Sequence, residues 1–276
     1  MYSGMARWAS LIKERRREHP AILLDAGGFT DPAPREGAEL DDDYFFEGMR
    51  SIGYEAAGVG PSEIEYGRTR LLERVDEAGF ELLSTNIVDK RGGGRLGSPW
   101  TILRVGGRKS IFGRTGGLRI GVFAVVLPRL VEEIDPLIPR YYDLIDPRLA
   151  ALEAVSALRE KNCDLIVALS YQGWGESLEL AREVPGIDLV INGKRGHGSA
   201  TGEMADGTMV VDTGMKRASF TEIAVEWRGG EPSFDVREVG GRARSMPDDP
   251  ELEKLEREYQ EIKESRDIES RRERDQ

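Results

Sequence analysis

The sequence contains few of the residues that most often bind catalytic metals or form cross-links. It has one cysteine, Cys163, and two histidines, His19 and His197. A single cysteine excludes an internal disulfide framework and a cysteine-rich zinc site. Because imidazole is the commonest side-chain ligand of catalytic transition metals, two histidines also exclude a dinuclear centre built from several of them.

Long apolar runs and an excess of positive charge are missing as well. No run approaches the ~20 apolar residues of a membrane-spanning helix. The early basic residues follow the first apolar patch, which is the reverse of the order in a secretory signal. The net charge of −11 argues against a nucleic-acid groove or an anionic membrane surface. We therefore expect no nucleic acid, no membrane span and no signal peptide in this chain, and we assign it to no compartment.

The sequence does contain short apolar runs that end in polar turns, a pattern typical of buried parallel strands. Two of them are most informative: Asp164–Ser170, and Ile187–Ile191, which a glycine-rich turn follows. In open α/β sheets, ligands bind beyond the carboxyl ends of the strands. The sequence therefore predicts one crevice at these strand ends. The side chains expected to project into it are Tyr171, Gln172, Asn192, Lys194, Arg195 and His197.

The C-terminal residues 246–276 differ from the rest of the chain in being rich in charge. Leu252, Leu255, Tyr259 and Ile262 recur at the spacing of a short coiled-coil stripe. This pattern predicts a helical tail or linker, which either packs on the body or extends into solvent. A protein partner could bind through this helix.

Several segments, in this order and spacing, match a known pattern. They are GMARWASLIKERRREHPAILLDAGG (Gly4–Gly28), GYEAAGVGPSEIEYG (Gly53–Gly67), FELLSTNI (Phe80–Ile87), CDLIVALSYQG (Cys163–Gly173) and VPGIDLVINGKRGHG (Val184–Gly198). Together they resemble the metallophosphatase domain of the 5′-nucleotidase family, among the calcineurin-like phosphoesterases. The resemblance implies an α/β fold in which two mixed β-sheets lie between helices, over residues 1–245. It also implies a site for two divalent metals at the strand ends, where they polarise a phosphoester and generate hydroxide.

The family's metal ligands map onto other residue types in this chain. The bridging aspartate of "DAGD" corresponds to Gly28, and the asparagine and histidine of "GNHE" correspond to Pro61 and Ser62. The histidine of "LSH" corresponds to Tyr171. The two histidines of "GGHxH" correspond to Lys194 and Gly196, with His197 one place late. The family's first motif, Asp-x-His, would lie upstream of Gly4, and its relatives are typically periplasmic or extracytoplasmic.

These replacements suggest the phosphoesterase fold without its mechanism, because a dinuclear site needs several anionic or imidazole donors. Lys194, a cation, would repel a metal. We expect no cofactor, no catalytic residue and a non-catalytic binding or assembly domain. The alternative is a phosphoester (nucleotide) hydrolase with an altered or single-metal site, which would need Asp25, Glu63, Asn86 or His197 to converge.

A basic turn at Lys194, Arg195 and His197 suggests a second use for the crevice. Cations and backbone N–H groups, with Asn86 nearby, could hold the phosphate of a small molecule. The other interpretation is a solvated turn, or an ion pair of Lys194 that fills the position of a metal.

Overall fold

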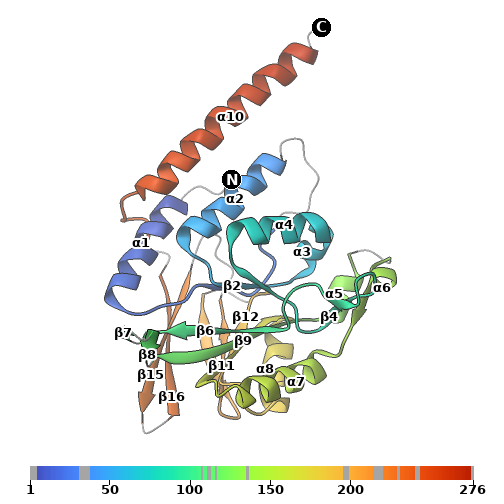
Figure 1. Ribbon diagram of the computed structural model, residues 1–276, viewed down its shortest axis with the longest axis vertical. Helices are drawn as coiled ribbons and strands as arrows, with labels where there is room; N and C mark the ends of the chain where they lie inside the picture. Colours follow the sequence, from blue (N-terminus) through green and yellow to red (C-terminus); the bar gives the residue numbers. More distant parts are fainter. Residues whose placement is uncertain are drawn as a thin grey trace.

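The computed structural model shows an α/β protein with a helix that extends from its body (Figure 1). The residues that it describes are 5–30, 38–106, 108–110, 113–115, 117–134, 137–194, 199–213, 220–228, 231–239 and 243–274. Within these ranges, no helix has both the length and the apolar character that crossing a membrane requires.

A six-stranded mixed sheet forms the centre of the molecule, in the order β13-β14-β12-β11-β9-β6. Its strands are β6 (Trp100–Val105), β9 (Leu118–Val126), β11 (Leu165–Tyr171), β12 (Leu189–Asn192), β13 (Thr201–Ala205) and β14 (Thr208–Asp212). The four inner strands are parallel, and the two edge strands pair antiparallel to them. Because both faces of β9 and β11 are covered, these strands are apolar almost throughout and nearly every residue in them is buried.

A second, smaller sheet packs on the first. It consists of β1 (Leu24–Asp25), β2 (Ala56–Gly58) and β3 (Glu81–Leu83), all parallel. Small side chains make the contact close: a Cβ built on Gly58 would lie 3.1 Å from the Cβ of Ala124. The predicted sandwich of sheets between helices is thus confirmed, although this smaller sheet is parallel rather than mixed.

Helices cover the outer faces of both sheets. Those over the small sheet are α1 (Met5–Glu18), α2 (Ala38–Ile52), α3 (Pro61–Tyr66) and α4 (Arg68–Ala78), and those over the large sheet are α7 (Pro147–Glu160) and α8 (Trp174–Glu183). The helical spacing of the larger apolar residues of α7 predicts one buried face made of Leu149, Leu152, Val155 and Leu158. In the structure Leu149 is 49% exposed, because alanines of α7 occupy the positions nearest the sheet.

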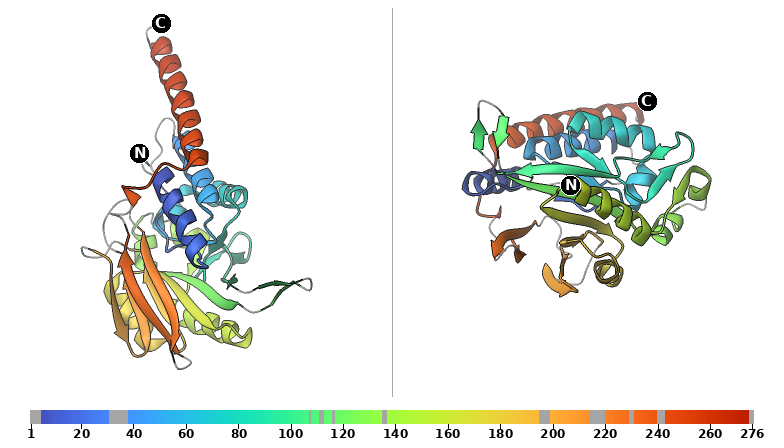
Figure 2. Two further views of the ribbon diagram at one scale, coloured as in Figure 1. Left: turned by 90° about the vertical axis from the view of Figure 1, so that its left-hand side faces the viewer. Right: turned by 60° about the horizontal axis from the view of Figure 1, so that its bottom comes forward.

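The remaining elements surround this core. They are β4 (Ile87–Asp89), β5 (Gly94–Arg95), β7 (Arg108–Ser110), β8 (Gly113–Thr115), α5 (Pro128–Glu132), α6 (Ile138–Tyr141), β10 (Tyr142–Leu144), β15 (Thr221–Arg228) and β16 (Glu231–Glu238). Strands β10, β4 and β5 make a small antiparallel sheet, and β15 pairs with β16. The β7–β8 hairpin extends from the body (Figure 2).

The last helix, α10 (Pro250–Arg274), divides into two parts. At its start Leu252 is fully buried against α1 and α2. About two turns further along the helix, Tyr259 stacks on Tyr44 of α2 with ring centroids 4.7 Å apart. Beyond this contact the helix leaves the body, and Ile268 is 52% exposed (Figure 1). The first half of α10 therefore packs on the body, and its second half extends into solvent.

Candidate functional site

The carboxyl ends of β1, β2 and β11 meet at the strand ends for which the sequence predicted a crevice, and we keep the name crevice for this region. The turn after β1 contains Gly28, the segment after β2 contains Gly60, and β11 ends at Tyr171. A Cβ built on Gly28 would lie 2.6 Å from Cε2 of Tyr171, and one on Gly60 would lie 3.3 Å from its Cδ2. The tyrosine ring therefore fills the space between these two loops, and it also packs on the apolar core beneath α2 and α4.

Gly28 has room for Tyr171 only because it has no side chain. Its φ is +77°, a conformation that other residues adopt at a cost. An aspartate at this position, as in the related pattern, would have to displace the ring. The loss of a side chain at Gly28 thus makes room for the larger side chain at Tyr171.

Glu63, the third residue of α3, is fully buried, and its carboxylate accepts six hydrogen bonds. Its carboxylate accepts from the backbone N–H groups of Gly28, Phe29, Thr30 and Gly60 at 2.8–2.9 Å. It also accepts from the hydroxyls of Thr30 and Ser62. One carboxylate therefore holds the turn after β1 against the start of α3.

Pro61 and Ser62 form the first turn of α3. Proline suits this position because the first N–H groups of a helix have no intrahelical partner. The Oγ of Ser62 donates to Oε1 of Glu63 at 3.0 Å. Since that carboxylate already accepts five other hydrogen bonds, Ser62 has no free base to activate it as a nucleophile.

Asp25, at the end of β1, is partly buried and accepts a hydrogen bond from the N–H of Gly27 at 2.8 Å. Burial raises the pKa of its carboxyl to about 7. The Gly27 N–H opposes this shift, and the nearby charge of Glu63 adds to it. Asp25 is thus a carboxyl that changes charge near neutral pH, next to the crevice.

Asn86 follows β3 and is almost completely buried. Its Nδ2 donates to the carbonyl oxygens of Val126 and Ile145 at 2.9 and 3.1 Å, and its Oδ1 accepts from the N–H of Val126 at 3.0 Å. The side chain therefore ties the end of β9 at Val126 to the backbone at Ile145. The sequence predicted that Asn86 binds an anion. In the structure, its side-chain amide forms hydrogen bonds with the backbone instead.

Buried polar side chains connect β11, β12 and α8 below the crevice. The hydroxyls of Ser170 and Ser177 are 2.9 Å apart, and Gln172 donates to Ser170 at 3.1 Å. Asn192 donates to the carbonyl oxygen of Lys194 at 2.9 Å, and the side chain of Lys194 is partly exposed. The network thus reaches the backbone of Lys194, at the end of the described segment.

Three other predicted positions lie outside the described residues: Arg195, Gly196 and His197. The structure brings together Gly28, Ser62 and Tyr171. It places Asn86 in the core, at the end of β3. The predicted anion site on the basic turn stays a prediction.

The structural role of Glu63 was missed at the level of sequence. Its signal is a proline at the first position of a helix with a glutamate two residues later, a pattern typical of a helix start in which the glutamate binds back to the preceding N–H. That Glu63 also binds the turn after β1 depends on two segments far apart in the chain, and no local pattern predicts it.

Across the described residues, no group of three or more His, Cys, Asp or Glu side chains is placed to hold a metal ion. At the positions that match the family's ligands, the structure has the ring of Tyr171 against Gly28 and the start of a helix at Pro61. The donor set described here does not fit two divalent ions, and we derive no step through them.

Comparison with known proteins relates the chain to 5′-nucleotidases. No protein-family model matches the chain. It is 30% identical over 188 residues to a 5′-nucleotidase of Vibrio parahaemolyticus, covering 66% of this chain and 32% of that protein. It is 28% identical over 191 residues to the protein UshA of Escherichia coli, covering 66% and 32%. The chain spans about a third of the length of these curated relatives.

Solved structures show the same fold. A sulfate thiohydrolase SoxB of Thermus thermophilus superimposes with a TM-score of 0.76 at 20% identity, over 92% of this chain and 46% of that one. The calcineurin-like phosphoesterase YfkN of Bacillus subtilis gives 0.72 at 17% identity, over 93% and 88%. A 5′-nucleotidase precursor of Thermus thermophilus gives 0.73 at 22% identity, over 95% and 53%.

These relatives correct one prediction. We expected no cofactor from the loss of ligand types, but 5′-nucleotidases and calcineurin-like phosphoesterases use divalent metals. That prediction was wrong. Tests of this protein must therefore include divalent ions.

Proposed function

Because this chain belongs to the 5′-nucleotidase family of calcineurin-like phosphoesterases, we propose that it is a non-catalytic member whose crevice serves binding or assembly. The proposal concerns turnover of phosphoesters. Any turnover by this protein is to be compared with that of the related 5′-nucleotidases, of whose length the chain spans about a third.

The observation that carries the proposal is the packing of Tyr171 on Gly28. A phosphoester that reacts at this point needs anionic or imidazole donors around it and space for its phosphate. The described structure has an aromatic ring there, and the Cβ of any ligand residue at position 28 would lie within 3 Å of it.

The polar residues that remain near the crevice support the same view, because their hydrogen bonds go to the fold. Glu63 binds four backbone N–H groups, and Asn86 binds two carbonyl oxygens and one N–H. A carboxylate or amide committed to the backbone has few lone pairs or protons left for a substrate.

The test is a phosphatase assay of the purified protein with Mn²⁺, Co²⁺ or Mg²⁺, against AMP and p-nitrophenyl phosphate. We expect no metal-dependent turnover. The 5′-nucleotidase of Vibrio parahaemolyticus, measured in parallel, is the positive control. Turnover that rises with metal and disappears with EDTA would overturn the proposal.

The alternative is a hydrolase with an altered or single-metal site, and the carboxyl of Asp25 beside the crevice favours it. If this alternative holds, Asp25→Asn abolishes the metal-dependent turnover, whereas the exposed Glu65→Gln leaves it unchanged. The same assay therefore distinguishes the two functions.

A further inference from the structure

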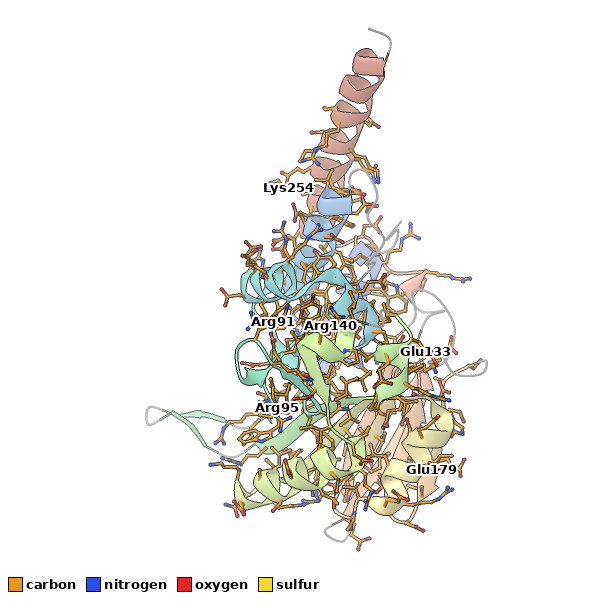
Figure 3. All side chains as sticks on the ribbon, turned by 90° about the vertical axis from the view of Figure 1, so that its right-hand side faces the viewer. Arg91, Arg95, Glu133, Arg140, Glu179 and Lys254 are labelled. Carbon is orange, nitrogen blue, oxygen red and sulfur yellow. The ribbon has the colours of Figure 1, made fainter. Side chains whose placement is uncertain are left out.

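A cleft rich in arginine lies between the first turn of α4 and the turn that joins β4 to β5. It has a volume of about 540 Å³ and is lined by Gly67, Arg68, Arg70, Asp89, Arg91 and Gly92, together with Thr69. None of the strand-end positions discussed above is among its lining residues. Figure 3 labels Arg91 on the face of the molecule that also carries Arg95 and Arg140.

The guanidinium groups of this cleft are held in place by fixed partners. Arg91 binds both oxygens of the buried Asp89 at 2.9 and 3.2 Å and donates to the hydroxyl of Tyr142 at 2.9 Å. It also lies 5.1 Å from the ring centroids of Tyr141 and Tyr142. Ordering a flexible side chain before a ligand arrives lowers the entropic cost of binding.

Charge in the cleft is not balanced. Arg68 forms an ion pair with the same Asp89 at 2.7 Å, so two guanidinium groups share one carboxylate. Arg70 has its own partner, Asp42, at 2.6 Å. Among the described residues that line the cleft, Asp89 is the one acid, so Arg68, Arg91 and Asp89 together leave one unit of positive charge, on a chain whose net charge is −11.

The start of α4 adds to this excess. Its first turn contains Arg68 and Arg70 and no acidic residue, and Gly67 supplies no side-chain cap. Cations at the positive end of a helix dipole are unfavourable. Local arrangements that cost stability are expected chiefly where function requires them.

The donors of Arg68 point to an oxyanion as the ligand. Within the described part of the chain, its two Nη groups have no hydrogen-bond partner, and the side chain is 40% exposed. A phosphate group has several oxygens and up to two negative charges, so it can bridge Arg68 and Arg91, whereas a carboxylate matches a single guanidinium. The volume exceeds that of the ion alone, and it falls within the range of small-molecule pockets.

We propose that this cleft binds a small molecule through its phosphate group, held between Arg68 and Arg91. The site is independent of the crevice and of whether the protein is a catalyst.

The test is isothermal titration calorimetry of the full chain with inorganic phosphate and with phenyl phosphate. The titrations contain EDTA and a constant ionic strength, so that binding through a metal does not contribute. We expect saturable binding by the wild-type protein. Gly92→Glu places an anion in the cleft without removing an ion pair, since a Cβ at Gly92 meets open space, and it should weaken binding at least tenfold.

The matched control is Gly94→Glu. It adds the same charge two residues further along the chain, at the start of β5, also into open space and at a residue that does not line the cleft. Arg68→Gln is the second variant, and it leaves Asp89 paired with Arg91. Lys194→Gln shows whether the crevice contributes.

Binding that is lost in Gly92→Glu and Arg68→Gln but kept in Gly94→Glu and Lys194→Gln supports the proposal. Phosphate that does not saturate the wild-type protein, or that binds Gly92→Glu and Gly94→Glu equally, overturns it. Loss in Lys194→Gln alone places the phosphate in the crevice and overturns it as well. Circular dichroism melts establish that each variant is folded.

Discussion

Gly28 and Tyr171 occupy one space: a Cβ on the glycine would lie 2.6 Å from Cε2 of the tyrosine and 2.9 Å from its hydroxyl oxygen. In the related pattern these two positions hold an aspartate and a histidine. Here one position has lost its side chain and the other has gained a larger one. The crevice therefore has packed side chains where the pattern has metal ligands.

This packing predicts strong coupling between the two positions. Gly28→Ala should lower the free energy of unfolding by about 2–3 kcal/mol, from its positive φ and from overpacking against the ring. With Tyr171→Ala as the background, the overpacking disappears and the cost should fall by about 1–2 kcal/mol. Urea denaturation of the two single variants and the double variant measures this coupling. Additive effects would show that the ring does not occupy this space in solution.

Glu63 should contribute to stability well beyond an ordinary surface carboxylate. Glu63→Gln turns one of its two acceptor oxygens into a donor that faces backbone N–H groups, and this should cost about 3 kcal/mol or more. Chemical denaturation measures the loss. Glu65→Gln is the matched control on the same helix, and since Glu65 is exposed its stability should change by less than about 0.5 kcal/mol.

Asp25 should make stability depend on pH. The pKa of its carboxyl is about 7 in the folded protein, above its ordinary value of 3.8. As pH rises from about 4 to 7, the unfolded chain loses this proton before the folded protein does, so the free energy of unfolding falls. Its partial exposure limits the change to about 2 kcal/mol.

Asp25→Asn removes this titration while keeping an oxygen that can accept from the N–H of Gly27. The stability of the variant relative to the wild-type protein should therefore increase from pH 4 to pH 7 and level off above pH 7. Thermal or urea unfolding across this range measures the difference. A constant difference would mean that Asp25 ionises at its ordinary pKa.

The two halves of α10 should respond differently to truncation of an apolar side chain. Leu252 is fully buried, so Leu252→Ala should cost about 2–4 kcal/mol. Ile268 is 52% exposed on the extended half, so Ile268→Ala should cost less than about 0.5 kcal/mol. Denaturation curves give both values. Equal costs would mean that the extended half also packs against something in solution.

Much of the fold was predictable, because its signals are local. Runs such as those of β9 and β11 are apolar from end to end, and this pattern indicates strands covered on both faces. Helix α7 is an exception in detail. Its face was assigned from its leucines, but Ala150, Ala151 and Ala154 lie nearest the sheet, because a small side chain allows the helix to approach closely.

The site was predictable in composition and not in arrangement. Residue types alone showed that Gly28 and Tyr171 are not the ligands of the related pattern. They did not show that the ring would lie on the glycine. Nor did they show that Asn86 would bridge backbone segments instead of facing the crevice.

The sequence by itself determined the kind and order of the elements, the kinship and the types of donor at the strand ends, because these depend on short-range periodicity and residue chemistry. The tertiary structure alone decided which side chains meet. Glu63 reaches the turn after β1, and Arg68 and Arg91 share Asp89, through strand order and helix packing. Such contacts join residues distant in the chain, and their geometry follows only once the core has brought the segments together.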